Sequence, residues 1–198
     1  MSTAIVAMQV PETQGHSVDK GRAAMFALIA AEATIFAIFV VAYLFYLGKS
    51  PTGPTPKAVL EPPIFYTICL LSSSLTIHAA VQQLRQGKTT TFAMWWLATL
   101  TLGGAFLYGT ANEWHRLIYM HGLTISTNLF GTTYYSLVGL HGFHVIVGLM
   151  FLSLVMAFTL FGTVKSRHSG RLDVLSLYWH FVDVVWVVVF TVVYIIGR

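Results

Sequence analysis

The sequence predicts an all-α membrane protein, a bundle of five transmembrane helices. Of its 198 residues, 56% are hydrophobic and only 9% are charged, whereas a soluble domain averages about 25% charged residues. The mean hydropathy is +0.73. Apolar residues gather in five stretches, and each has the roughly 20 residues that a membrane-spanning helix requires. The chain therefore has no room for a large soluble domain.

Each predicted span ends at a segment that favours a turn. A Pro/Gly loop follows the first span, with Pro62 and Pro63 opening the second helix. A short basic turn follows the second span, and residues 112–128 are expected to lie at the membrane surface. The fourth span is longer than a straight crossing requires, so it tilts or projects. The spans are predicted at about residues 23–47, 62–84, 92–111, 131–161 and 174–196.

The basic residues predict the orientation of the bundle. Residues 1–20 lack the early basic cluster and long apolar core of a signal peptide, so we expect a cytoplasmic tail followed by a five-helix domain over 21–198. Seven Lys and Arg residues fall on the side of the tail and four on the other. The positive-inside rule then places the N-terminus in the cytoplasm and the C-terminus outside. The net charge of +4 suggests contact with anionic lipid and not with nucleic acid.

Two acidic residues, Glu32 and Asp183, are the formally charged groups inside the predicted spans. An acid at the centre of a span costs roughly 2.5–3.5 kcal/mol on an insertion scale. Each must therefore find a partner or be neutral.

Polar residues that could supply such partners recur at helical spacing. His141 and His144 are three residues apart and share a helix face, as do His180 and Asp183. His78 closes the second span after Ser72, Ser73 and Ser74, which are small enough to bond across a helix contact, and Glu113 ends the third. We expect the aromatic residues near the span ends to be interfacial anchors: Trp95, Trp96, Trp114, Trp179 and Tyr178.

These polar residues admit three interpretations. The first is a metal site built from His141, His144, His180, Asp183 and Glu32. The second is a proton relay, which needs a continuous polar chain across the membrane. The third is interhelical hydrogen bonding, at roughly 0.6–2 kcal/mol per bond, and this is the interpretation that we favour. The single cysteine, Cys69, provides neither a disulfide nor a cysteine metal site.

Several motifs resemble a known family. GLHGFHVIVG and YWHFVDVVWVVVFTVVYIIG are similar to the two strongest signatures of subunit III of haem–copper oxidases. The segments LLSSSLTIHAA, TLGGAFLYGTANEWHRLI and the Glu32 helix resemble further helices of that family in the same order. The resemblance runs from about residue 20 to the C-terminus.

The resemblance implies a five-helix bacterial subunit in the cell (inner) membrane. Such a subunit carries no haem or copper and packs on the catalytic subunit I, in a complex that reduces oxygen to water and pumps protons. The haems and copper lie in partner subunits, which include subunit II and in some complexes a small subunit IV or a larger supercomplex. The resemblance also implies bound phospholipid, protection of subunit I and support of proton uptake.

The resemblance assigns the polar residues to structural roles. Glu32 with His144 resembles a buried polar cluster, and His141, His180 and Asp183 resemble the structural and lipid-side set. The first two helices of seven-helix relatives are absent here, and the acid that precedes the family's last helix is matched by the shorter Asp173.

Two other functions stay open at this point. A five-helix accessory subunit of a nitric oxide reductase would have the same fold. A stand-alone metal-dependent membrane enzyme or transporter would bind metal stoichiometrically, and His141→Ala would abolish that binding.

Overall fold

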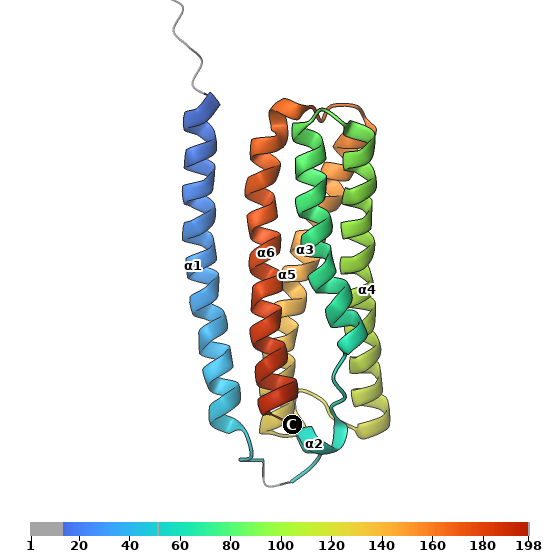
Figure 1. Ribbon diagram of the computed structural model, residues 1–198. Helices are drawn as coiled ribbons and strands as arrows, with labels where there is room; N and C mark the ends of the chain where they lie inside the picture. The colour runs from blue at the N-terminus through green and yellow to red at the C-terminus, as the bar shows by residue number, and fades with distance from the viewer. Residues whose placement is uncertain (1–13, 51, 198) are drawn as a thin grey trace, which may run out of the picture.

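The computed structural model describes residues 14–50 and 52–197, and over these residues it contains helices and no strands. Five long helices run side by side (Figure 1). All five are long and apolar enough to cross a membrane, which confirms the predicted fold class. The long helices are α1 Gln14–Tyr46, α3 Ile64–Arg85, α4 Thr89–His121, α5 Leu129–Leu160 and α6 Ser169–Phe190; the short pieces are α2 Pro56–Val59, the 3₁₀ turn η1 Ser166–His168 and the π-helical turn η2 Thr191–Ile196.

Several helix boundaries differ from the prediction, among them the start of α6, which lies at Ser169 and not at residue 174. Helix α4 continues to His121 through residues expected at the surface, because no Gly or Pro occurs in residues 112–121; Gly122 then closes the helix at a left-handed φ of 62°. Helix α1 begins at Gln14, inside the predicted tail, whose residues 1–13 lie outside the described part of the chain. Pro63 is the N-cap residue of α3 and not its first helical residue, because the helix begins at Ile64.

The core lies among α3, α4, α5 and α6 and is rich in tryptophan. Trp96 and Trp179 were expected at the membrane interface, but both are fully buried, so that expectation was wrong. Their indole N–H groups find acceptors inside the bundle: Trp96 Nε1 donates to the Leu152 carbonyl at 2.9 Å, and Trp179 Nε1 donates to Ser73 Oγ at 2.8 Å. An indole N–H that already has an acceptor inside the bundle does not need the water and headgroups of the membrane interface as hydrogen-bond partners.

Helix α1 stands apart from this core (Figure 1). It packs mainly on α5 and α6. Only 6% of the 18-residue stretch with the highest hydropathy is buried in α1, compared with 22–50% of the corresponding stretches in the other spans. Its buried residues include Phe36 and Tyr43, which are seven residues apart and so lie on one seam. The helix is therefore attached to the bundle along a single narrow stripe.

Candidate functional site

The first polar cluster joins α1 to α5 through Glu32 and His144. Glu32 Oε2 lies 3.0 Å from His144 Nε2, and His144 Nδ1 lies 2.7 Å from the Leu140 carbonyl oxygen. Because a carbonyl oxygen can only accept, Nδ1 must carry a hydrogen. A second hydrogen must then lie between His144 Nε2 and Glu32 Oε2, bonded to one of these two atoms. The pair therefore keeps one proton inside the membrane layer, which satisfies both groups without an unpaired charge.

A cavity of about 460 Å³ opens beside this pair, between α1, α5 and α6. Its walls are mainly apolar, from Met25 and Leu28 on α1 and from Phe143 and Val147 on α5. Arg171 on α6 lies at one end. We call this cavity the α1 groove. It combines a long apolar wall, one base at its end and the Glu32–His144 pair in its side.

The second cluster joins α3 to α6. Ser74 Oγ donates to Asp183 Oδ2 and lies 2.9 Å from His180 Nδ1. The Asp183 side chain is buried. The structure thus brings together His180 and Asp183, expected on one face, with one of the three serines expected at a helix contact. A buried acid held by a neighbouring helix fixes the rotation of both helices.

His141 has a different environment from the other histidines. Its ring is fully buried, and neither ring nitrogen has a hydrogen-bond partner within the part of the chain that the structure describes. The ring stacks on Trp186 at a centroid distance of 4.9 Å and meets the edge of Phe106 at 5.6 Å. His141 therefore serves as an aromatic packing residue and not as a partner of Glu32 or Asp183.

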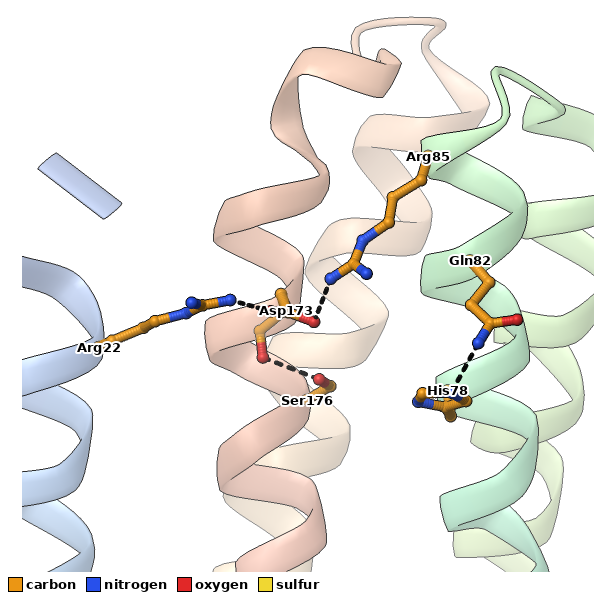
Figure 2. A network of polar contacts seen from close by, with 6 residues as sticks. All are labelled: Arg22, His78, Gln82, Arg85, Asp173 and Ser176. Carbon is orange, nitrogen blue, oxygen red and sulfur yellow. Dashed lines mark hydrogen bonds and ion pairs between the residues drawn. The ribbon is translucent and has the colours of Figure 1, made fainter. Parts of the chain in front are cut away.

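The third cluster lies at the end of the bundle that carries Arg22 and Arg85, which we call the basic end. Figure 2 shows Asp173 between these two arginines: Oδ2 is 2.5 Å from Arg22 Nη2, and Oδ1 is 2.8 Å from Arg85 Nη2. One carboxylate on α6 thus links α1 and α3. His78, close by on α3, accepts a hydrogen bond from Gln82 Nε2 at 2.7 Å. Sequence reasoning named Asp173 but did not pair it with either arginine, although the count of basic residues had placed Arg22 and Arg85 on the same side of the membrane.

Replacing Asp173 by Asn is expected to cost no more than about 1 kcal/mol per ion pair, because these pairs are solvent-accessible. The arginine side chains are 45% and 52% exposed, and Asp173 is 24% exposed. Thermal unfolding of the purified protein at low and high salt checks this. High salt should lower the midpoint of the wild type more than that of Asp173→Asn. Equal salt responses would show that the network does not contribute to stability.

Glu113 lies at the opposite end of the bundle, which carries α2. Tyr194 OH donates to Glu113, at 2.9 Å from each carboxylate oxygen. Nearby, Arg116 Nη1 is 2.6 Å from Glu61 Oε2. This arrangement is separate from the clusters of α1 and α3.

The five residues of the metal interpretation do not form one site. Among the described residues, no three His, Cys, Asp or Glu side chains are grouped closely enough to hold a metal ion. Glu32 pairs with His144, His180 shares Ser74 with Asp183, and His141 is packed among aromatic rings. The geometry favours the third interpretation, in which these groups bond between helices.

Five apolar helices and buried polar groups that bond across their contacts define a multi-pass membrane protein with a structural polar core. The family model for cytochrome c oxidase subunit III matches residues 11–198. The chain therefore belongs to the cytochrome c oxidase subunit III family.

Relatives of known name cover nearly the whole chain. It is 33% identical to the cytochrome bo(3) ubiquinol oxidase subunit 3 of Pseudomonas aeruginosa, over 100% of this chain and 99% of the relative. It is 32% identical to the cytochrome c oxidase subunit 3 of Bacillus subtilis, over 85% of this chain and 83% of the relative. It is also 31% identical to the quinol oxidase subunit 3 of that organism, with the same coverage. The chain is thus a multi-pass bacterial membrane protein and a subunit III of the haem–copper oxidases.

Proposed function

We propose that this chain is a non-catalytic subunit that stabilises the catalytic subunit I, holds phospholipid and supports proton uptake while the complex reduces oxygen to water and pumps protons. The observation that carries the proposal is the α1 groove with the Glu32–His144 pair in its wall. A helix attached along one stripe, beside an apolar groove, suits a subunit that binds lipid and presents helices to a partner.

Phospholipid binding is supported by the chemistry of the α1 groove. Apolar side chains along α1 and α5 would contact an acyl chain, and Arg171 at the groove end would attract a phosphate. The positive-inside expectation puts this end at the cytoplasmic leaflet. The lipid would fill the space that α1 leaves open and so would strengthen its attachment.

In this proposal the redox chemistry belongs to other chains. Subunits I and II carry the haems and copper, and this chain contributes no redox centre of its own. Subunit IV or a larger supercomplex would be further partners. The polar groups of this chain already bond to one another in pairs, so we expect these pairs to hold the helices in register.

The test is to tag this chain, extract it gently from native membranes, and record the reduced-minus-oxidised spectrum with and without carbon monoxide. We expect a carbon-monoxide-binding haem in proportion to the chain, because a haem–copper subunit I should travel with it. A preparation that stays folded and homogeneous without haem would contradict the proposal. Metal analysis of that preparation would then test the stand-alone alternative.

A further inference from the structure

The two halves of α1 are attached to the bundle to different degrees. In the half toward the α2 end, Phe36 is 4% exposed and Tyr43 is 1% exposed. The Tyr43 hydroxyl lies against the end of η2, because a Cβ at Gly197 would come within 2.5 Å of it. In the half toward the basic end, none of residues 20–35 is buried. We call residues 20–35 the α1 arm.

The segment that follows α1 ties its α2 end to the start of α5. Asn128 Nδ2 donates to the carbonyl oxygens of Thr52 and Pro54, at 3.1 and 3.2 Å. Ser50 Oγ accepts a hydrogen bond from the Phe130 backbone N–H at 3.1 Å. Asn128 is also the N-cap residue of α5, so its side chain is held in place. The α2 end of α1 is therefore fixed by hydrogen bonds as well as by packing.

The α1 arm has two polar contacts with the bundle. At the basic end, Arg22 forms its ion pair with Asp173 (Figure 2), but the Arg22 side chain is 45% exposed. An ion pair this exposed contributes little to stability, and salt weakens it. Near the other end of the arm, Glu32 bonds to His144. Between these two contacts the arm borders the α1 groove.

We infer that the α1 arm is a hinged gate, which swings away from α6 about a pivot at Phe36 and Tyr43 when Arg22 releases Asp173. Arg22 lies about 21 Å from Phe36 along the helix, at 1.5 Å per residue. A tilt of roughly 10°, well within the range of membrane helices, moves the Arg22 end by about 4 Å and breaks the ion pair. Glu32 is one turn from the pivot, so the same tilt moves it by only about 1 Å. The gate therefore opens the α1 groove at its basic end and leaves the Glu32–His144 pair in place.

Opening of the gate leaves no carboxylate unpaired. Asp173 keeps its second ion pair, with Arg85 on α3 at 2.8 Å. Arg22 is already half exposed, so water replaces its lost contact. Both states of the gate are consequently close in free energy, and a single exposed ion pair decides the balance between them.

Pulsed electron paramagnetic resonance on the purified oxidase complex in nanodiscs tests the gate. The spin labels are carried by a non-canonical amino acid, so that cysteines of partner subunits stay unlabelled. One pair of labels, at Ala24 and Met94, spans α1 and α4 at the basic end, and a second pair, at Val41 and Met120, spans them toward the α2 end; all four side chains are exposed. We expect two distances for the first pair and one narrow distribution for the second. A single narrow distribution for both pairs, or equal broadening of both, would overturn the inference.

Two matched variants identify the contact that closes the gate. Arg22→Gln and Arg85→Gln each remove one guanidinium from the same carboxylate, but only Arg22 lies on α1. Arg22→Gln should raise the ratio of open to closed states by about two- to fivefold, which is what an exposed ion pair can contribute. Arg85→Gln should leave that ratio at the wild-type value. Equal ratios in the two variants would refute the role of Arg22. The wild type at high salt should resemble Arg22→Gln, and this comparison requires no variant that folds.

The gate concerns the α1 groove, on which the proposed function rests, but its test needs neither added lipid nor haem chemistry. The distances are measured within this chain, in the assembly in which it is purified, whether or not haem is present. A haem-containing complex with one narrow distance at the basic end would refute the gate alone. Two distances in a haem-free preparation would support the gate and contradict the proposed function.

Discussion

A methyl group added at Gly148 is expected to destabilise the chain by about 1–3 kcal/mol, as overpacking of a filled core does. A Cβ at Gly148 would lie 2.8 Å from the Trp179 ring, a separation that packed atoms do not tolerate. The ring cannot retreat, because a Cβ at Gly103 would also come within 2.9 Å of it and its Nε1 is bonded to Ser73. Trp179 is thus wedged between α4 and α5.

Gly142 supplies the matched control for Gly148→Ala. It lies on the same helix, and nothing comes within 4 Å of its added Cβ. Gly142→Ala should be neutral or stabilising by up to about 1 kcal/mol, since alanine is the better helix former. Unfolding in detergent, followed by circular dichroism, compares the two variants. Equal stabilities would show that Trp179 has room to move.

The second large effect is expected for Glu32→Ala. The alanine leaves His144 Nε2, on a side chain that is 8% exposed, without the carboxylate that now bonds to it. An interhelical bond of this kind contributes roughly 0.6–2 kcal/mol, which corresponds to about 3- to 30-fold in the equilibrium for release of α1. We expect oxygen reduction by the complex to start near the wild-type rate and then decline faster, with less lipid retained.

The oxygen electrode measures this decline over successive turnovers, and lipid analysis of the purified complex accompanies it. Glu32→Gln keeps a side chain that can bond to His144 and should fall between alanine and wild type. Thr34→Ala removes an exposed hydroxyl that bonds only to the preceding turn of α1, and should behave as wild type. An immediate and complete loss of haem reduction in Glu32→Ala would instead place Glu32 in the redox core.

The fold was predictable because membrane insertion depends on local hydropathy. All five spans appear where apolar residues gather. The end of α4 was not predictable in this way, because Glu113 and Arg116 made a continuing helix look like a surface segment. Trp96 and Trp179 were wrongly predicted at the interface, because burial depends on which helix faces meet. For Trp179 the burial also depends on Gly103, which is distant in the sequence and lies against its ring.

Helical spacing predicted the polar clusters as candidates but not as pairs, and only the family resemblance had put Glu32 together with His144. Helical spacing puts His141 and His144 on neighbouring positions, yet only His144 meets Glu32, while His141 turns toward Trp186. The link between Arg22 and Asp173 spans 151 residues of sequence, and no local pattern signals such a partner. The structure supplies what spacing cannot, namely the direction in which each side chain leaves its helix.

The one-sided attachment of α1 bears on how the five described spans come together. A chain is synthesised from its N-terminus, so α1 is made before the other four described spans, yet its partners His144 and Asp173 are made 112 and 151 residues after the groups they bind. Until then α1 must persist as a solitary span with Glu32 unpaired. The mean hydropathy of its most apolar stretch is 2.4, the highest of the five spans, and this keeps the helix stable in the membrane until its partners are made. We therefore expect α1, the earliest made of the five described spans, to dock late.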